Sequence, residues 1–428
     1  MNTSAMNDDV LTPRLDWRWK GFPPAAGAVT ADTIREQKWN VLAGDMLLPV
    51  MVMKESALQH NLGTVASFCR ERGVSLAPHG KTTMAPQLVR RQFDYGAWAV
   101  CAATVSQARI FRAFGAPRVL IANEVVDAAA ITWIAQEKDR HPEVELYSLV
   151  DSIAGVSLMI EALEAHRMQS QLSVLVEIGA PGARAGCRTA DEALAVADAV
   201  AGSGRLRLAG VEGYEGIIHR DGMDATLAAI DTYLDTVRTV THDLAARGLF
   251  ADQSEVIVSA GGSAYFDRVV ERLTEPWDIG IPARIVLRSG CYLTHDDGHY
   301  DRLSPFGSVR GDARLRPALE VWGAVLSRPE PELAIVGFGK RDVPYDRELP
   351  VIRKVMTRRG DVRSPDGGLV VTALDDQHAY VRVEGDMLEV GALIGCGISH
   401  PCTAFDKWPL IPVVDDDYNV IDAVRTFF

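Results

Sequence analysis

The sequence predicts an α/β protein made of a (β/α)8 TIM-type barrel followed by a C-terminal β-rich domain. Two patterns lead to this expectation. Between residues 74 and 287, eight short apolar segments alternate with segments in which apolar side chains recur every three to four residues, as expected for strands and amphipathic helices. After about residue 303, the helical period ends, and short valine-rich segments are separated by proline and glycine. Eight strands joined by helices favour a parallel sheet that closes into a barrel.

The segment before the barrel is irregular. Residues 1–46 contain several prolines and tryptophans, and we expect this extension to pack on the β-rich domain. Residues 47–53 form an apolar strand that lies outside the eight barrel units, so it is expected to pair with the β-rich domain. A helix follows over 55–72, because its apolar residues keep helical spacing and Gly73 ends it.

Strands and helices of the barrel are expected to alternate. The predicted strands are Val74–Ala77, Trp98–Ala102, Arg118–Ile121, Glu145–Val150, Leu172–Ile178, Leu206–Val211, Glu255–Ser259 and Arg284–Leu287. The predicted helices include Ser106–Phe114, Asp127–Lys138, Ile153–His166, Ala190–Ala201 and Ala225–Arg247. In the β-rich domain, strands are predicted at Ala318–Leu326, Leu333–Val336, Gly368–Ala373, Ala379–Val383 and Met387–Gly391. The barrel is therefore assigned to residues 47–302 and the β-rich domain to residues 303–428.

The composition is that of a globular protein with a sizeable core. The 428 residues are 47% hydrophobic and 24% charged, with a formal net charge of −13. Nucleic-acid surfaces need clustered lysine and arginine, which this acidic chain does not show. The longest apolar stretches are too short to span a membrane, and the first residues lack the basic start and apolar run of a secretory signal. Six scattered cysteines indicate a reducing cytoplasm.

One lysine stands where barrel enzymes place their chemistry. The first predicted barrel strand ends at Ala77, Pro78 and Gly80 break it, and Lys81 follows at the carboxyl end of the strand. A solvated surface cation is the simpler interpretation of a lysine in this position. A phosphate loop is a weaker alternative, because Ser75 occupies the position of the first glycine in that motif.

Polar and glycine-rich loops follow the fifth to eighth predicted barrel strands. They are Gly179–Gly186, which contains Arg184, and residues 212–216, 259–263 and 288–292. The third of these loops opens a helix, and a helix N-terminus favours anions. Loops after the last two strands of such barrels often bind phosphate. Each loop could instead be an ordinary turn, but two adjacent ones at the expected strands favour a phosphate site.

A histidine and a cysteine two residues apart form a candidate metal site near the C-terminus. In an extended segment His400 and Cys402 point to the same side, and imidazole and thiolate are both zinc ligands. The pair alone is weak, because structural zinc sites use more protein ligands and isolated pairs are usually core residues. The segment from His295 to Asp297, with His299, could also hold a metal, although a solvated loop is the simpler interpretation.

Taken together, these motifs resemble the pyridoxal-phosphate enzymes of fold type III, which have an alanine-racemase-like barrel, in particular the D-serine dehydratase and D-threonine aldolase branch. The resemblance spans most of the chain, and its motifs occur in the family's order. The residues that carry it are Pro78-His79-Gly80-Lys81-Thr82, Arg184 with Gly186, Gly213-Tyr214-Glu215-Gly216, Ser259-Ala260-Gly261-Gly262-Ser263, Arg288-Ser289-Gly290-Cys291-Tyr292 and His400-Pro401-Cys402.

The resemblance implies a role for each of these residues. Lys81 would hold pyridoxal 5'-phosphate as a Schiff base, and His400 with Cys402 would bind zinc at the β-hydroxyl of the substrate. The implied cofactor-binding set is His79, Lys81, Arg184, Tyr214, Ser259, Gly261, Gly262, Gly290, Cys291 and Tyr292. Within it, Arg184 approaches the cofactor ring, Tyr214 lines it, and the glycines with Cys291 and Tyr292 hold the phosphate. The family also implies a homodimer with the active site near the interface.

Two positions depart from the family's pattern. Thr83 stands where the family commonly has histidine, and Cys291 stands where a small hydroxyl residue is frequent. These departures affect substrate detail and phosphate affinity rather than the Schiff base.

The reaction implied is β-elimination from a D-3-hydroxy amino acid such as D-serine, giving a 2-oxo acid and ammonia, with Lys81 as the base. Retro-aldol cleavage to glycine and an aldehyde, as in D-threonine aldolases, is the main alternative. A thiolate ligand favours zinc, whereas the aldolase branch resembles a site for harder metals, so Cys402 favours the dehydratase. A cofactor-binding protein without catalytic activity is a third possibility.

Overall fold

The computed structural model describes residues 14–312, 314–365, 367–385 and 388–428. These residues form two compact units. The barrel unit consists of Ala66–Lys81 and Gln92–Gly290, and the β unit consists of the described residues up to Val65, Thr82–Arg91 and Cys291–Phe428. The chain thus passes between the units directly after Lys81 and directly after Gly290.

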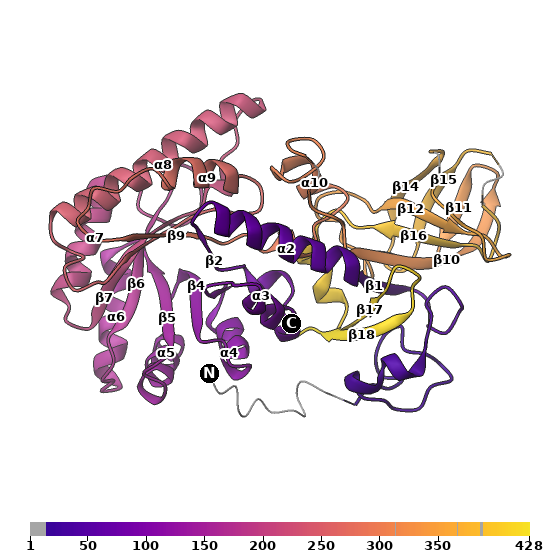
Figure 1. Ribbon diagram of the computed structural model, residues 1–428, viewed down its shortest axis with the longest axis horizontal. Helices are drawn as coiled ribbons and strands as arrows, with labels where there is room; N and C mark the ends of the chain where they lie inside the picture. The colour runs from indigo at the N-terminus through magenta and orange to yellow at the C-terminus, as the bar shows by residue number, and fades with distance from the viewer. Residues whose placement is uncertain (1–13, 313, 366, 386–387) are drawn as a thin grey trace. The chain divides into compact units, whose positions relative to one another are not determined.

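The barrel unit is an eight-stranded sheet in which all neighbouring strands are parallel (Figure 1). The strand order is β2-β9-β8-β7-β6-β5-β4-β3. The bounds are β2 Ser75–Leu76, β3 Val100–Ala102, β4 Arg118–Glu124, β5 Glu145–Val150, β6 Leu172–Ile178, β7 Leu206–Gly213, β8 Val256–Ser259 and β9 Ala283–Leu287. All eight predicted barrel strands are confirmed.

The two edge strands of this sheet are joined to each other. The N–H of Trp98 donates to the carbonyl of Leu76 at 2.7 Å, and the N–H of Cys101 donates to the carbonyl of Pro78 at 2.9 Å. A single parallel bridge between His79 and Cys101 completes the link. The sheet therefore curls back on itself, as predicted, and the carboxyl ends of its strands lie around one mouth.

Helices alternate with the barrel strands, and most begin with a capping side chain. They are α4 Val105–Ala113, α5 Ala128–Arg140, α6 Ile153–Ala165, α7 Ala190–Gly202, α8 Met223–Ala246 and α9 Phe266–Leu273. Thr104, Asp127, Ser152 and Thr189 each accept a hydrogen bond from a backbone N–H of the first turn, in α4 to α7 respectively. These caps satisfy N–H groups that a helix start otherwise leaves unpaired.

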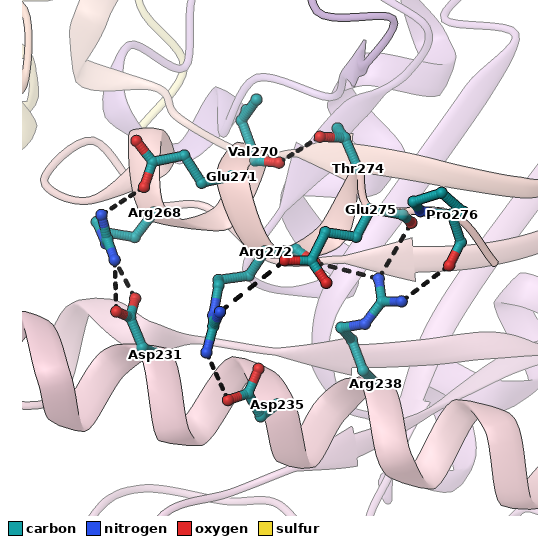
Figure 2. Close-up of polar contacts among 10 residues, drawn as sticks. All are labelled: Asp231, Asp235, Arg238, Arg268, Val270, Glu271, Arg272, Thr274, Glu275 and Pro276. Atoms are coloured by element: carbon teal, nitrogen blue, oxygen red, sulfur yellow. Dashed lines mark hydrogen bonds and ion pairs between the residues drawn. The ribbon is translucent and has the colours of Figure 1, made fainter.

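Helices α8 and α9 are tied by ion pairs (Figure 2). Arg268 pairs with Asp231, and its Nε donates to Oδ1 at 2.9 Å. Arg272 donates to Asp235 at 2.6 Å. Arg238 of α8 reaches the backbone carbonyls at the end of α9, including that of Pro276 at 3.0 Å. Because α9 follows the glycine-rich loop after β8, these contacts fix the element on which that loop ends.

The β unit contains a ten-stranded sheet. Its main path is β13-β12-β16-β10-β1-β17-β18, and β11, β15 and β14 extend from β10. The bounds are β1 Val50–Lys54, β10 Leu319–Glu330, β11 Leu333–Val336, β12 Val351–Met356, β13 Val362–Arg363, β14 Leu369–Leu374, β15 Ala379–Val383, β16 Leu393–Gly397, β17 Leu410–Val414 and β18 Val420–Arg425. Strand β1 pairs antiparallel with β10, so the predicted pairing of residues 47–53 with the β-rich part is confirmed.

One predicted strand of the β-rich part is wrong. Met387 lies outside the described residues, and residues 388–391 form no strand. The strand begins later, at β16, because Gly391 adopts φ +87°, a left-handed conformation that belongs to a turn. Strands β12, β13, β17 and β18 were not predicted from the sequence.

The remaining helical elements of the chain are short or span a unit boundary. Helix α2 covers Glu55–Glu71 and α3 covers Pro86–Asp94, and α10 covers His299–Leu303. The 3-10 helices are η1 Ala31–Thr33, η2 Arg35–Gln37, η3 Gly80–Thr82, η4 Glu215–Ile217, η5 Cys291–Leu293, η6 Pro401–Thr403 and η7 Phe405–Lys407. Among the described residues, no helix has both the length and the apolar character needed to cross a membrane.

Each unit has its own hydrophobic core. Small and branched side chains fill the barrel, among them Ala77, Cys101, Leu120 and Ile257. In the β unit, the described part of the N-terminal segment packs on the sheet: Leu15, Phe22, Ile34 and Trp39 share a buried cluster with Val50, Trp322 and Tyr418. Residues 1–13 lie outside the described part of the chain.

Candidate functional site

Lys81 lies in a short helical turn at the carboxyl end of β2. The strand ends at Leu76, and Ala77 still donates its N–H to Leu287 of β9 at 2.8 Å. The turn η3 then presents Lys81, whose side chain is half-buried. Gly80 is required here because a Cβ atom would clash with the ring of Phe111. The predicted position of the lysine at the barrel mouth is therefore the position observed.

His79 has an unused nitrogen. Its Nδ1 is buried and has no hydrogen-bond partner among the described residues. Burial lowers the pKa of His79 well below its usual value, and the positive charges of Lys81, Arg288 and Arg184 lower it further. The imidazole is consequently neutral at physiological pH, and three cations of the predicted site act on it. An unpaired buried nitrogen beside the proposed cofactor lysine is a free place for a ligand.

A buried ion pair connects the ends of β7 and β9. Glu212 and Arg288 are in direct contact, and both side chains are buried. Arg288 also donates to the carbonyl of Gly213 at 2.7 Å. Burial raises the pKa of Glu212, and the charge of Arg288 opposes this rise. The pair fixes the loop after β9 against the loop after β7.

Glu177, at the end of β6, is held in its protonated form. Burial raises its pKa to about 10, and the charge of Glu212 and a hydrogen bond with Glu124 add to the effect. At neutral pH the group is therefore a neutral hydrogen-bond donor rather than a carboxylate. The carboxyl groups of Glu124, Glu177 and Glu212 come from three different strands and act on one another within the barrel.

The ring of Tyr214 lies between a cation and two glycines. The Arg184 guanidinium carbon is 4.7 Å from the ring centroid. A Cβ on Gly262 would lie 2.7 Å from Cε2 of this ring, and one on Gly216 would lie 2.5 Å from its hydroxyl. The two glycines therefore leave the space that the ring needs. Arg184 and Tyr214, predicted to act on one ligand, are brought together.

The backbone amides of the glycine loop after β8 already have an acceptor. The carboxylate of Glu215 is fully buried and accepts the N–H of Gly261 at 2.9 Å and that of Gly262 at 2.8 Å. Ser259 donates its hydroxyl to the carbonyl of Val286 at 3.1 Å. Phosphate binding by these residues stays a prediction, and it requires Glu215 to release the two N–H groups.

The predicted metal ligands His400 and Cys402 lie in the β unit. A second sulfur atom and a hydroxyl group lie close to the sulfur of Cys402. The Sγ atom of Cys402 is 3.3 Å from that of Cys291 and 3.4 Å from Oγ1 of Thr82. His400 precedes η6, which contains Cys402, whereas Cys291 begins η5. The hydrogen bond from Cys291 lowers the pKa of Cys402 well below its usual value. The same hydrogen bond and burial raise the pKa of Cys291, so Cys402 is the more acidic thiol of the two.

Asp346 orients the imidazole of His400. Its Oδ2 lies 2.7 Å from Nδ1 of His400, and its Oδ1 accepts the hydroxyl of Thr403 at 2.6 Å. Burial opposes protonation, but hydrogen bonds with Cys402 and Asp346 raise the pKa of His400. A carboxylate on one ring nitrogen leaves the other nitrogen free to bind a metal, as in many zinc sites.

The second metal candidate from the sequence has a structural role. His295 and Asp296 are 1% and 0% exposed, so the expectation of a solvated loop is wrong for both. Asp296 accepts the N–H groups of Gly298 and Tyr300 at 2.9 Å, which holds the start of α10. Within the described residues, no group of three or more His, Cys, Asp or Glu side chains is placed to hold a metal ion.

The predicted cofactor residues fall into two sets. His79, Lys81, Arg184, Tyr214, Ser259, Gly261, Gly262 and Gly290 belong to the barrel unit, whereas Cys291 and Tyr292 belong to the β unit with His400 and Cys402. Tyr292 is 3% exposed. For Cys291, a role in phosphate binding stays a prediction, and its contact with Cys402 is a feature that the sequence did not reveal.

Comparison with known proteins places the chain in a family. A family model described as "Alanine racemase, N-terminal domain" matches residues 53–278, which is more than half of the chain. The protein belongs to this family. A second model, described as "Putative serine dehydratase domain", matches residues 318–414. The resemblance found in the sequence, to fold type III pyridoxal-phosphate enzymes, is thereby confirmed.

Several known proteins are similar over most of the chain. A 3-hydroxy-D-aspartate aldolase of Paracoccus denitrificans (strain Pd 1222) is 26% identical over 347 residues, which are 80% of this chain and 82% of the relative. The crystal structure of D-threonine aldolase from Filomicrobium marinum superposes with a TM-score of 0.72 at 26% identity, over 89% of this chain and 95% of that chain. D-threo-3-hydroxyaspartate dehydratase from Delftia sp. HT23 gives a TM-score of 0.70 at 20% identity, covers 91% and 99%, and shows the same fold.

Sequence reasoning missed several residues of this alanine racemase family member's site. Glu124 ends β4 and Glu177 is the last residue but one of β6, and an acidic residue that follows a run of apolar strand residues is a signal that could have been used. Asp346 precedes His400 by 54 residues and lies in no motif, so the sequence offers no signal for it. The sequence distinguishes Thr82 only as the neighbour of Lys81.

Proposed function

We propose that the protein is a pyridoxal-phosphate-dependent, zinc-assisted dehydratase of D-3-hydroxy amino acids, a lyase that yields a 2-oxo acid and ammonia. The observation that carries the proposal is the pair of soft donor groups, the imidazole of His400 and the sulfur of Cys402. A hydrogen bond with Asp346 orients the imidazole. Membership in the alanine racemase family supports the cofactor. The two aldolases and the dehydratase among its relatives support a D-hydroxy amino acid substrate and a lyase.

The residues of the barrel mouth fit the proposed cofactor. Lys81 supplies the amine, Tyr214 and Arg184 supply a flat, cationic surface, and His79 supplies a buried nitrogen without a partner among the described residues. When bound, the cofactor provides the electron sink that lets a bond at the α-carbon break. Glu212 pairs with Arg288, and Glu177 is protonated and carries no charge, so Lys81 and Arg184 are the two other cations acting on His79 that can attract an anionic cofactor.

Lys81 is the proposed base. Lys81 is half-buried in the turn that follows β2, and its amine would take the α-proton of the substrate. The pKa of His79 lies well below its usual value, so its imidazole is neutral at physiological pH and does not act as an imidazolium acid. His79 therefore does not compete with Lys81 in proton transfer.

The donor set of the β unit fits zinc. Nε2 of His400 and Sγ of Cys402 are the proposed ligands, and Asp346 holds the ring by its other nitrogen. A zinc ion there would act as a Lewis acid on the departing hydroxyl. Two protein ligands leave positions for water and substrate. A mutant of D-threo-3-hydroxyaspartate dehydratase has been solved in a form described as metal-free, which supports a metal in a protein of this fold.

Retro-aldol cleavage is the second candidate, because D-threonine aldolase and 3-hydroxy-D-aspartate aldolase are among the relatives at 26% identity. The two reactions break different bonds: elimination breaks Cβ–O, and aldol cleavage breaks Cα–Cβ. Cys402 favours elimination, since a thiolate selects a softer metal than the carboxylate-rich sites of magnesium or manganese.

Product analysis separates the two reactions. Purified protein with pyridoxal phosphate and zinc is given D-threonine and, separately, D-serine and D-threo-3-hydroxyaspartate. We expect 2-oxobutyrate and ammonia from D-threonine, with loss of both products in Lys81→Ala and Cys402→Ala. Cys69→Ala, a buried cysteine of α2, is the matched control and should retain activity. Glycine and acetaldehyde from D-threonine would overturn the dehydratase in favour of the aldolase.

We also propose that the protein acts as a homodimer. The support is the family alone, and light scattering coupled to size-exclusion chromatography tests it. A monomeric mass with full activity would contradict it.

A further inference from the structure

We propose that Cys291 and Cys402 form a reversible disulfide on exposure to peroxide, and that this disulfide and a metal at His400 and Cys402 exclude each other. The first half concerns the thiols alone. The second half rests on the zinc site of the proposed function. The pair is a modification site that the resemblance to the family does not supply, since Cys291 stands where the family frequently has a hydroxyl residue.

The two sulfur atoms are already in contact. They are 3.3 Å apart, although 111 residues separate them in the chain. A disulfide is about 2.0 Å long, so the sulfurs need to approach by a little over 1 Å. Each lies in a one-turn helix, Cys291 in η5 and Cys402 in η6. The other cysteines lie elsewhere: Cys69 in α2, Cys101 in β3, Cys187 after β6 and Cys396 in β16.

Exposure assigns different roles to the two cysteines. Cys402 is half-buried, whereas Cys291 is 4% exposed. A small oxidant therefore reaches Cys402 first, and Cys291 waits behind it as the resolving thiol. The surroundings of Cys402 are polar, because the Thr82 hydroxyl lies 3.4 Å from its sulfur and His400 hydrogen-bonds to it. Such surroundings accommodate the charge that moves during the attack on peroxide.

The chemistry balances with hydrogen peroxide as the oxidant. The sulfur of Cys402 attacks one peroxide oxygen, the O–O bond breaks, and a sulfenic acid and hydroxide form. The thiol of Cys291 then attacks the sulfenic sulfur, the S–O bond breaks, and the sulfenic oxygen leaves as water. The proton of the Cys291 thiol goes into this water molecule. One proton from solvent converts the hydroxide of the first step into a second water molecule. Two thiols are oxidised by two electrons, and peroxide is reduced by the same two.

Oxidation removes the ligand on which the metal depends. A disulfide sulfur carries no negative charge and is a poor zinc ligand, because thiolate is the form that binds. His400 would then be the only one of the two proposed ligands left. Conversely, zinc on Cys402 occupies the sulfur lone pair that attacks peroxide. Metal and peroxide thus compete for one atom.

The test uses the full-length protein in zinc-free and zinc-loaded forms, each treated with peroxide and analysed by intact mass and peptide mapping. In the zinc-free form we expect a loss of two hydrogen atoms, a cross-linked peptide joining Cys291 to Cys402, and full reversal by dithiothreitol. Zinc should slow the cross-link at least about ten-fold, and the oxidised protein should retain less than about a tenth of its zinc by elemental analysis. Cys69→Ser should behave as the parent.

Cys291→Ser sharpens the result. Without a resolving thiol, Cys402 should gain oxygen atoms and lose reversibility, as the oxidation ladder predicts. Absence of the cross-linked peptide in the zinc-free parent protein overturns the thiol pair, and this measurement needs no variant. A cross-link that forms equally fast with zinc present overturns the mutual exclusion and, with it, the zinc ligand Cys402, while the thiol pair stands. Both measurements read mass and metal content rather than turnover, so failure of the disulfide is distinguishable from failure of the proposed reaction.

Discussion

The barrel mouth and the cluster around Cys402 solve the problem of buried polar groups in different ways. At the mouth, the buried carboxyl groups have different kinds of partner: Glu212 pairs with Arg288, and Glu215 accepts two backbone N–H groups. In the β unit, His400 and Cys402 pair with each other. Asp346 is the further partner of His400, and Cys291 and Thr82 are the further partners of Cys402. The first arrangement is shared among many groups, and the second depends on single contacts.

The origin of the residues differs in the same way. Groups of the mouth follow β2, β4, β6, β7, β8 and β9, so the repeating topology of the barrel brings them together. The cluster of the β unit collects Thr82, Cys291, Asp346, His400 and Cys402 from four separate stretches of chain. Only packing of the whole β unit places them. The comparison therefore predicts a large loss at Lys81, a graded loss at the metal cluster and small losses in the supporting frame.

The largest effect is expected at Lys81. Lys81→Ala removes the amine that is proposed both to attach the cofactor and to act as the base. Activity should therefore fall by about 100- to 10,000-fold. Borohydride reduction followed by peptide mapping should place pyridoxal phosphate on Lys81 in the parent and on no lysine in the variant. Lys340→Ala, at an exposed site of the β unit, is the control. Cofactor found on another lysine of the parent would contradict the assignment.

The next largest effect is expected at Asp346. Asp346→Ala frees the imidazole of His400 to rotate, and loss of such a partner typically weakens metal binding about 10- to 100-fold. Competition with a chelator measures the zinc affinity. Cofactor binding in the barrel unit should be unchanged, which is the contrast that the comparison requires. Asp376→Ala, whose side chain is 72% exposed in an ion pair, should leave zinc affinity intact. If Asp346→Ala binds zinc as tightly as the parent protein, zinc binding at His400 does not depend on Asp346 as a single partner.

At the barrel mouth, the interactions among buried carboxyl groups should make the free energy of unfolding depend on pH. The pKa of Glu177 is about 10 in the folded chain against 4.5 when unfolded, so the folded state holds the proton more tightly. The stability from this group is complete below about pH 4.5 and is lost as the pH rises toward about 10. Glu177→Gln keeps a neutral hydrogen-bonding group and removes this dependence.

Denaturant unfolding of the two proteins between about pH 6 and pH 9 measures the difference. We expect the parent to lose roughly 1–3 kcal/mol more free energy of unfolding than Glu177→Gln over this interval, less than the limit of about 1.4 kcal/mol per pH unit because the charge of Glu212 acts on Glu177 and the two groups titrate together. Parallel curves would mean that Glu177 is ionised in the folded protein.

The barrel was predictable because its signal is local and repeated. Each strand is an apolar run of a few residues, each helix carries its own period, and the position of Lys81 follows from the strand that precedes it. The pairing of residues 47–53 with the β-rich domain was predicted because this apolar segment lies outside the eight barrel units, and β1 does pair with β10. The strand placed at residues 387–391 was wrong because a glycine-ended turn and a valine-rich strand share a composition.

The contacts within the sites were not predictable, since they join distant residues. No spacing rule connects Asp346 to His400, or Cys291 to Cys402. The glycines after β8 suggested an anion, but the sequence could not show that a carboxylate of the protein itself, Glu215, accepts their N–H groups. Residue types can predict which chemistry is available, whereas partners are decided by packing.

The smallest effect is expected in the frame that holds the barrel mouth. Arg268 and Asp231 link α9 to α8 and are 26% and 22% exposed, whereas Arg247 and Asp198 form a comparable pair at 48% and 53% exposure (Figure 2 shows the first pair). Alanine double-mutant cycles should give a coupling of about 0.5–1 kcal/mol for the first pair and less than about 0.5 kcal/mol for the second, because water screens exposed charges.

Glu271 also pairs with Arg268 and keeps part of its interaction when Asp231 is removed, which lowers the first value. Cofactor content should stay constant in every variant, since the tie between these helices is shared with Arg272 and Arg238. A coupling well above about 1 kcal/mol accompanied by loss of cofactor would show that the mouth, like the metal cluster, depends on a single contact.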